Sequence, residues 1–165
     1  MKTVFTTIFI AFTSLLFAQN TTETAINQVV LEAYKAIGFE KGTSPDYVAI
    51  KAIFTPKAML YNYRSGKLEI TNIDEFLAGY KGMVESDDFT AFREIELGGK
   101  TEYFGKIGHR ISAYASYING MEEVGERGVN SFQLVQVKGK WLISSIIWDI
   151  ESKNLPIPEQ YLSKQ

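Results

Sequence analysis

The second half of the sequence predicts a series of strands, and carboxylate and tyrosine side chains lie along them. The candidates for proton transfer are Asp149, Glu94 and Tyr117. A carboxyl group in an apolar pocket has a raised pKa, so it can act as a general acid or base near neutral pH. A tyrosine hydroxyl beside it can donate a hydrogen bond to a developing oxyanion. These residue types fit proton transfer next to a carbonyl group, provided that they face one pocket.

The turn between the last two predicted strands sets their register. Residues 127–137 and 140–151 flank Lys138-Gly139, a two-residue loop with glycine second that favours a tight hairpin. Val137 then faces Lys140, and side chains alternate between the two faces along each strand. The predicted pairs on one face are Leu134 with Ile143, Phe132 with Ser145, Asn130 with Ile147, and Gly128 with Asp149. This face is apolar with a few polar points, as a pocket wall would be.

The preceding strand, residues 107–119, extends this face. We pair Asn119 with Glu126 across the loop of residues 120–125, which places Tyr117 opposite Gly128. The inner positions of this strand are then His109, Ile111, Ala113, Ala115 and Tyr117. The small Ala113 and Ala115 side chains would leave room for a ligand.

The strand predicted over residues 89–104 adds the glutamates. Pairing Phe104 with Ile107 brings Glu94 beside Tyr117 and Glu96 beside Ala115. Adjacent glycines inside a strand indicate a bulge or bend. A bulge at Gly98-Gly99 would exchange the two glutamates for Ile95 and Leu97.

We therefore expect the polar end of the pocket to hold the catalytic candidates, with the ligand contacts around them. The expected ligand-binding residues are Asn130, Phe132, Ala113, Ala115, Ser145, Ile147, Glu96 and His109. A purely structural role stays open for each of them: Asp149 as a solvated carboxylate at a strand end, Glu94 and Glu96 as exposed strand residues, and Asn130 as a structural amide. The register places His109, the only histidine, away from Tyr117 and Asp149. A general base there would need Glu102 or a helix residue as its partner, and a packed or surface histidine is the favoured interpretation.

Composition excludes several kinds of site. One histidine and no cysteine exclude the usual structural zinc sites. A hard cation bound by carboxylates has no motif here, so we predict no metal and no cofactor. The glycine-rich stretch GKIGHR lacks the spacing of a phosphate-binding loop, and no serine nucleophile elbow or dinucleotide fingerprint occurs. A formal net charge of −2 without a basic stripe gives no footprint for nucleic acid.

The first 18 residues have the layout of a secretory signal peptide. Lys2 precedes an uncharged apolar run, Val4 to Phe17, and Ala18 ends it. We predict cleavage after Ala18 and export to the periplasm or beyond. The alternative, an uncleaved membrane anchor, has a run shorter than the ~20 residues that span a bilayer. Residues 19–165 then form one domain, stabilised by packing alone because no disulfide is available.

Helical patterns come first along that domain and strands later. Helices are predicted over residues 21–38, from a start at Ser44-Pro45-Asp46 to about Phe54, and from Ile73 to Met83 after an Asn72 or Thr71 cap. A strand over 58–63, a Ser65-Gly66 turn and a short strand over 68–70 separate the last two. This order indicates an α+β domain in which helices pack on one face of a bent antiparallel sheet.

Several segments resemble the nuclear transport factor 2-like superfamily, in particular its SnoaL-like bacterial members. They are FGKIGHRISAYASY, RGVNSFQLV, GKWLISSIIWDIES and LPIPEQYL. The resemblance covers about residues 25–162 and implies a cone: a curved antiparallel sheet wrapped around the N-terminal helices, with a cavity at its wide end. It also implies a tendency to dimerise through the outer sheet face. Because the superfamily includes isomerases, dehydratases and transport factors, the resemblance leaves the activity open.

The predicted outer face is too apolar for a fully solvated surface. Its expected residues are Val129, Ser131, Gln133, Val135, Leu142, Ser144, Ile146 and Trp148. A homodimer would cover them, and the alternative is a C-terminal tail that folds back.

Three functions follow as hypotheses. The first is a secreted protein that binds a small, partly apolar molecule in its cone. The second is an isomerase or lyase that uses Asp149 or Glu94 as base and Tyr117 as hydrogen-bond donor. The third is a protein-binding or assembly module. Whether the protein is an enzyme is left undecided by the sequence.

Overall fold

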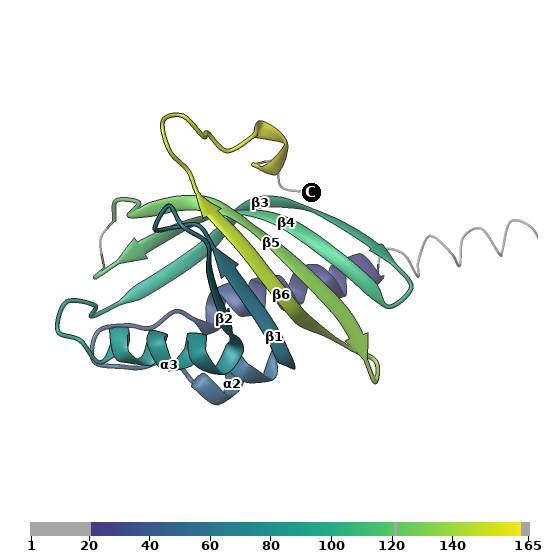
Figure 1. Ribbon diagram of the computed structural model, residues 1–165, viewed down its shortest axis with the longest axis horizontal. Helices are drawn as coiled ribbons and strands as arrows, with labels where there is room; N and C mark the ends of the chain where they lie inside the picture. Colours follow the sequence, from purple (N-terminus) through teal and green to yellow (C-terminus); the bar gives the residue numbers. More distant parts are fainter. Residues whose placement is uncertain (1–20, 121, 163–165) are drawn as a thin grey trace, which may run out of the picture.

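A curved six-stranded sheet forms the body of the protein (Figure 1). The computed structural model describes residues 21–120 and 122–162, so the predicted signal peptide, residues 1–18, lies outside the described residues. The strands, in chain order, are β1 (Phe54–Asn62), β2 (Glu69–Asn72), β3 (Phe92–Phe104), β4 (Ile107–Ile118), β5 (Glu126–Val137) and β6 (Lys140–Ile150). In space they follow the order β2-β1-β6-β5-β4-β3. Neighbouring strands are antiparallel except β1 and β6, which are parallel and depart from the purely antiparallel sheet that we expected.

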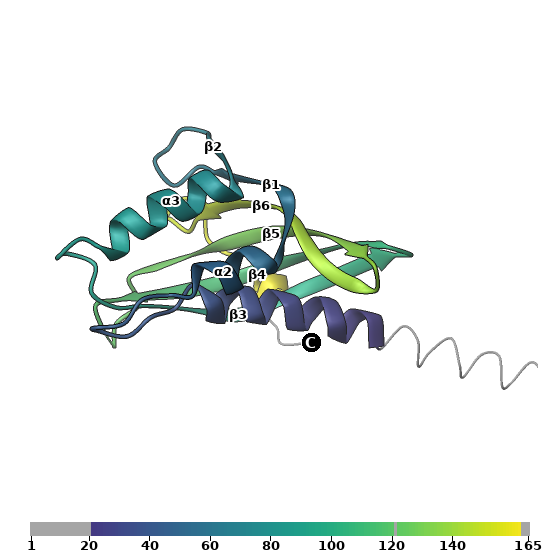
Figure 2. The same cartoon turned by 90° about the horizontal axis from the view of Figure 1, so that it is seen from below.

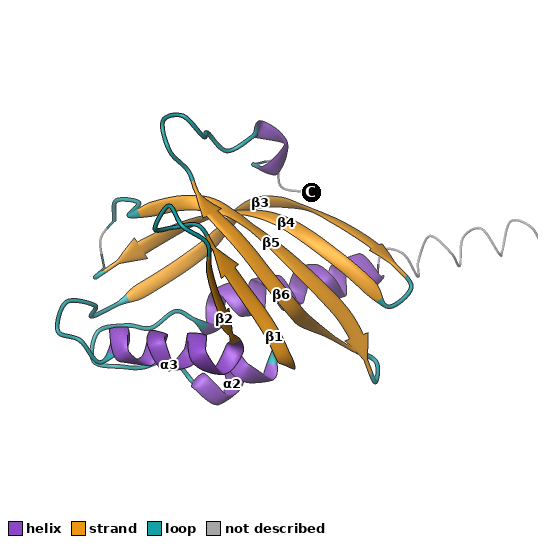
Figure 3. Ribbon diagram, in the orientation of Figure 1, coloured by secondary structure: helices purple, strands orange, loops and turns teal. Residues whose placement is uncertain are grey.

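The helices lie together on the concave side of this sheet (Figures 2 and 3). They span residues 21–36, α2 (Tyr47–Ala52) and α3 (Ile73–Val84). The predicted α+β fold, with helices inside a curved sheet, is therefore confirmed. None of the described helices is long and apolar enough to span a membrane.

Side-chain caps begin both short helices, at Asp46 within the predicted start Ser44-Pro45-Asp46 and at Asn72, one of the two predicted caps. The Asp46 carboxylate accepts hydrogen bonds from the first backbone N–H groups of α2. Asn72 does the same for α3, and Glu75 bonds back to the Asn72 N–H, which completes a capping box.

The final hairpin has the predicted turn but a different register beyond it. Val137 pairs with Lys140 and Leu134 with Ile143, as predicted, and Lys138 and Gly139 both have positive φ. A bulge at Ser144 then shifts the pairing by one residue, so that Phe132 pairs with Ile146 and not with Ser145. Because side chains alternate, this shift reverses the faces of the rest of β6. Ile146 and Trp148 join the core, while Ile147 and Asp149 face outward.

The predicted pairing of β4 with β5 is also wrong. Ser116, rather than Asn119, pairs with Glu126, and the shift by three residues reverses the faces of β4. The cause is visible at Asn119, which has a positive φ of 58° and fastens the loop before β3. Its side chain accepts from the Thr90 N–H at 2.7 Å and donates to the Asp88 carbonyl oxygen at 2.8 Å. Asn119 therefore serves that loop and not the β4–β5 ladder.

In β3 the hairpin pair Phe104 with Ile107 is confirmed, and a bulge lies between Glu96 and Gly98. Glu96 consequently pairs with Tyr114 and Glu94 with Ser116. Both glutamates share the inner face with these β4 residues, because the bulge in β3 and the changed register of β4 compensate each other.

A C-terminal tail covers part of the outer face, which was the alternative to a dimer. Ile157 is buried, and its N–H bonds to the Glu151 carboxylate at 2.9 Å. The tail ends with the short 3₁₀ helix η1 (Glu159–Tyr161), which lies against β3 and β4. A Cβ on Gly98 would lie within 2.9 Å of the backbone of Tyr161 and Leu162, so glycine is needed for this approach. The predicted homodimer stays a prediction, restricted to the outer surface that the tail leaves open.

We predict that Asn72→Ala lowers the free energy of unfolding by about 1 kcal/mol, because two N–H groups at the start of α3 lose their acceptor. Urea unfolding of the purified protein measures this. Asn72→Asp is the matched control: it keeps the acceptor and adds a charge that suits a helix N-terminus, so its midpoint should stay near that of the wild type. Equal losses for both variants would contradict the role of the cap.

Candidate functional site

A buried ion pair joins β3 to β4 on the inner face of the sheet. The Arg110 guanidinium donates to both oxygens of the Glu96 carboxylate, with Nε to Oε1 at 2.7 Å and Nη2 to Oε2 at 3.0 Å. The two side chains are 6% and 11% exposed. A paired geometry of this kind compensates much of the cost of removing two charges from water, whereas either charge alone would be strongly destabilising.

The same guanidinium holds the helix of residues 21–36. Arg110 Nη1 donates to Asn27 Oδ1 at 3.0 Å and to Thr101 Oγ1 at 2.8 Å. Thr101 in turn donates to the Asn27 oxygen at 2.5 Å. Gly99 makes room for this cation, since a Cβ there would lie 3.1 Å from the guanidinium carbon and 2.5 Å from the Ile111 carbonyl oxygen.

A chain of hydrogen bonds leads from Glu96 to the middle of the sheet. Ser112 Oγ donates to Glu96 Oε1 at 2.6 Å, so the Tyr34 hydroxyl, 2.8 Å away, donates to Ser112. Asn130 Nδ2 donates to the Tyr34 oxygen at 3.0 Å. Burial raises the pKa of Tyr34 well above its usual range, so the hydroxyl stays protonated and the direction of the chain is fixed.

Glu94 lies next to this chain of hydrogen bonds. Among the described residues, no cation contacts it as Arg110 contacts Glu96. Desolvation raises its pKa to about 8, and the Glu126 carboxylate adds to this effect. A hydrogen bond from the Asn130 side chain and the charge of Arg64 act in the opposite direction. The carboxyl group is therefore largely protonated at neutral pH, when it can both donate and accept a hydrogen bond.

Another glutamate, Glu126 on β5, lies two strands away from Glu94, with Ser116 of β4 between them in the ladder. Glu126 accepts from the Tyr114 hydroxyl at 2.9 Å and forms an ion pair with Arg64 at 2.7 Å. Burial, followed by the charges of Glu126 and Glu94, raises the pKa of Tyr114. The Tyr114 hydroxyl lies directly over Gly128, where a Cβ would be only 2.6 Å from it.

A groove of about 520 Å³ opens beside these groups, between the helix of residues 21–36 and the first half of β3. Tyr34, Glu94 and Glu96 contribute its polar lining. Its apolar lining includes Leu31, Phe39, Phe92 and Ile95, and Lys35, Glu40 and Arg93 also border it. The groove thus combines a mostly apolar wall with a protonatable carboxyl group, as small-molecule sites often do.

The structure brings together part of the predicted site. Glu94, Glu96, Asn130 and Phe132 lie on the inner face, and the Phe132 ring meets the Tyr34 ring edge-on at 5.7 Å between centroids. For Glu94 and Glu96, the alternative of exposed strand residues does not hold. Asn130 bonds within the protein, to Tyr34, as the structural interpretation expected.

The other predicted residues lie on the outer face, so their expected position inside the cone is wrong. Asp149 is exposed and accepts from the Ile150 N–H at 2.8 Å. Tyr117 lies under the Arg93 guanidinium at 4.2 Å. The remaining members of this group are Ala113, Ala115, Ser145, Ile147 and His109. Ala113 and Ala115 are buried, but at the face that the tail approaches, so the room beside them does not belong to the groove.

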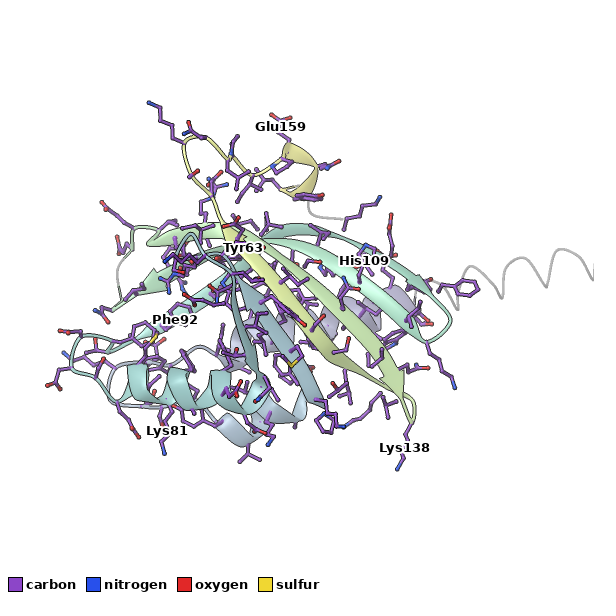
Figure 4. The ribbon with its side chains drawn as sticks, in the orientation of Figure 1. Tyr63, Lys81, Phe92, His109, Lys138 and Glu159 are labelled. Carbon is purple, nitrogen blue, oxygen red and sulfur yellow. The ribbon has the colours of Figure 1, made fainter. Side chains whose placement is uncertain are left out.

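His109 has the partner that the sequence suggested. Its Nε2 lies 3.4 Å from a Glu102 carboxylate oxygen, and its side chain is 38% exposed. Figure 4 places it along β4, far from Phe92, which marks the groove end of β3.

Sequence reasoning missed the residues that organise the site. Tyr34 lies in the predicted helix of residues 21–38 but was not singled out, and Arg110, Ser112 and Tyr114 were placed on the outer face by the wrong register. The available signal was Arg110 itself, a charged residue on a strand inside the predicted sheet, where a buried charge needs a partner. No cluster of metal-binding side chains occurs among residues 21–120 and 122–162, and the predicted absence of cofactors is left as a prediction.

Comparisons with known proteins identify the fold and not an activity. No family model matches the sequence, and no curated protein does. Among solved structures, a candidate dehydratase of the NTF2-like family from Streptomyces avermitilis is similar with a TM-score of 0.63 at 12% identity, covering 81% of this chain and 99% of that one. A candidate scytalone dehydratase from Novosphingobium aromaticivorans gives 0.62 at 11% identity, covering 81% and 87%.

An NTF2-like protein of unknown function from Silicibacter pomeroyi gives a TM-score of 0.58 at 20% identity, covering 81% of this chain and 98% of that one. These likenesses run over most of the described chain and agree with the helices-in-sheet arrangement found here. The chain therefore has the nuclear transport factor 2-like fold.

Proposed function

We propose that the protein binds a small, partly apolar molecule in the groove beside Glu94. The observation that carries this proposal is a desolvated carboxyl group, with a pKa of about 8, at the wall of an otherwise largely apolar groove of about 520 Å³. A neutral carboxyl group donates a hydrogen bond to a carbonyl or hydroxyl oxygen, so it suits a ligand that carries one such group on an apolar body.

The fixed surroundings of Glu94 support a ligand site. Asn130 and Tyr34 are immobilised by the hydrogen-bond chain to Glu96, so the polar end of the groove is formed before a ligand arrives. Preorganisation of this kind reduces the entropy that binding costs. The fold neighbours described as candidate dehydratases are consistent with a small-molecule site in this fold.

A second candidate function is proton transfer, and the raised pKa of Glu94 favours it. In this isomerase or lyase hypothesis Glu94, and not Asp149, is the base. Tyr34 would take the role of hydrogen-bond donor that was predicted for Tyr117, although its hydroxyl proton is already directed to Ser112. Ligand binding without turnover therefore remains the better supported function.

We also propose that the protein is exported, with the signal peptide removed after Ala18. The layout of residues 1–18 supports this. Mass determination of the N-terminus after secretion tests it.

We predict that Leu31→Trp reduces ligand occupancy by at least about tenfold, because an indole at this position fills the groove without touching the polar network. Native mass spectrometry of the protein purified from its own host measures the co-purifying molecule. Val48→Trp is the matched control, since Val48 is 81% exposed on α2, away from the groove. Unchanged occupancy in Leu31→Trp would refute the groove as the binding site.

The raised pKa of Glu94 predicts a pH dependence of stability. Between about pH 4.5 and 8 the folded state holds a proton that the unfolded state releases, so stability from this group is lost as pH rises through that window. The slope is at most about 1.4 kcal/mol per pH unit. Urea unfolding at several pH values should show a flatter profile for Glu94→Gln than for the wild type. Asp149→Asn should keep the wild-type profile, and a flattened profile in that control would reassign the effect.

If the protein is an enzyme, Glu94→Gln should lower kcat by about 10²- to 10⁴-fold while ligand binding persists. Turnover assays with the molecule found by mass spectrometry test this. Full turnover in Glu94→Gln would remove the proton-transfer hypothesis and leave the binding function intact.

A further inference from the structure

Two hairpin tips meet at the end of the sheet opposite the groove. The β3–β4 tip has Gly105-Lys106 at its turn, and the β5–β6 tip has Lys138-Gly139. They lie side by side, because Ile107 pairs with Val135 and the Gln136 N–H donates to the Lys106 carbonyl oxygen at 2.8 Å. Figure 4 shows Lys138 projecting from the end of its hairpin.

The tips expose large apolar side chains. Phe104 is 84% exposed and Ile107 is 60% exposed, and Val137 on the neighbouring tip is 44% exposed. A phenylalanine at the apex of a rigid hairpin adds nothing to the core, and its exposure in water is unfavourable. These three residues, from two adjacent turns, form one apolar edge.

The charged residues of the two tip segments are all lysines. Lys106, Lys138 and Lys140 are exposed, and residues 103–108 and 136–141 contain no acidic residue. The acidic residue just before the first tip, Glu102, is paired with Lys100 at 2.8 Å and lies 3.4 Å from His109. This basic edge stands out because the whole chain has a formal net charge of −2.

The described chain also begins at this edge (Figure 1). The helix of residues 21–36 starts beside the β3–β4 hairpin, and Ile26 packs over Gly108, where a Cβ would lie 2.8 Å from its Cδ1. Residue 21, the first that the structure describes, therefore lies at the end of the sheet that carries the tips.

We propose that the two hairpin tips dock the protein on an anionic lipid bilayer. Phe104, Ile107 and Val137 enter the interface between headgroups and acyl chains, and the three lysines contact lipid phosphates. Apolar side chains flanked by lysines are the combination that interfacial binding requires, since apolar insertion and attraction to anionic lipids add together. In this orientation the groove at the other end of the sheet stays open to water. The proposal is independent of the function of that groove.

Vesicle co-sedimentation tests the proposal, with the protein as its own host exports it. The wild type should bind vesicles of phosphatidylcholine mixed with phosphatidylglycerol, and binding should weaken as salt rises. Lys106→Gln/Lys138→Gln/Lys140→Gln should lower the partition coefficient by about fivefold for each lysine removed. Lys41→Gln/Lys67→Gln/Lys153→Gln is the matched control, because it changes the net charge equally at exposed sites away from the tips.

The apolar half is tested by Phe104→Ser/Ile107→Ser, which should lower the partition coefficient at least tenfold, with Val48→Ser as control. All variants keep the same N-terminus, so differences between them report on the tips alone. Equal binding to phosphatidylcholine vesicles, or tip variants that bind as well as their controls, would overturn the proposal. So would a wild type that ignores vesicles but forms a dimer that Phe104→Ser/Ile107→Ser disperses, since that result assigns the edge to a second copy of this chain.

Discussion

The buried pair of Arg110 and Glu96 is the interaction on which the interior depends. It joins β3 to β4, and through Asn27 and Thr101 it fixes the helix of residues 21–36 against the sheet. Through Ser112 it also orients Tyr34, which positions Asn130 on β5. Removing either charge would leave the other buried without a partner, at a cost of about 3–5 kcal/mol. The pair therefore fixes how the helix crosses the sheet, and with it the width of the groove.

This arrangement gives two neighbouring glutamates different chemistry. Glu96 has a guanidinium in contact and Glu94 does not, although both lie on the same strand face. Glu94 lacks a compensating charge in contact, and desolvation raises its pKa to about 8. The difference comes from the position of Arg110, which is opposite Thr101 in the ladder and reaches back along β3 across Gly99.

Much of the fold could be predicted from the sequence because its signals are local. The helix start at Ser44-Pro45-Asp46, the Asn72 cap and the Lys138-Gly139 turn are each defined by neighbouring residues. The β4–β5 register was missed because Asn119 bonds to Thr90 and Asp88, which are far away in the sequence. The bulge at Ser144 has no glycine to signal it, whereas Gly98-Gly99 did signal the bulge in β3. Glu94 and Glu96 were correctly predicted on the inner face, because the bulge in β3 and the changed register of β4 cancel each other. Asp149 was placed on the wrong face, because nothing cancels the bulge at Ser144 in β6.

The strand order has a consequence for how the chain folds. β1 and β2, made early, touch the rest of the sheet only through β6, the last strand in the chain. The parallel pairing of β1 with β6 closes a loop from Phe54 to Ile143, and long loops of this kind slow folding because chain entropy is lost before the contacts form. A nascent chain that lacks β6 can form the β3–β4–β5 meander, but the β1–β2 pair cannot yet join it. The sheet becomes a single cooperative unit only when its last strand is in place, and this late step is the one at which folding and aggregation compete.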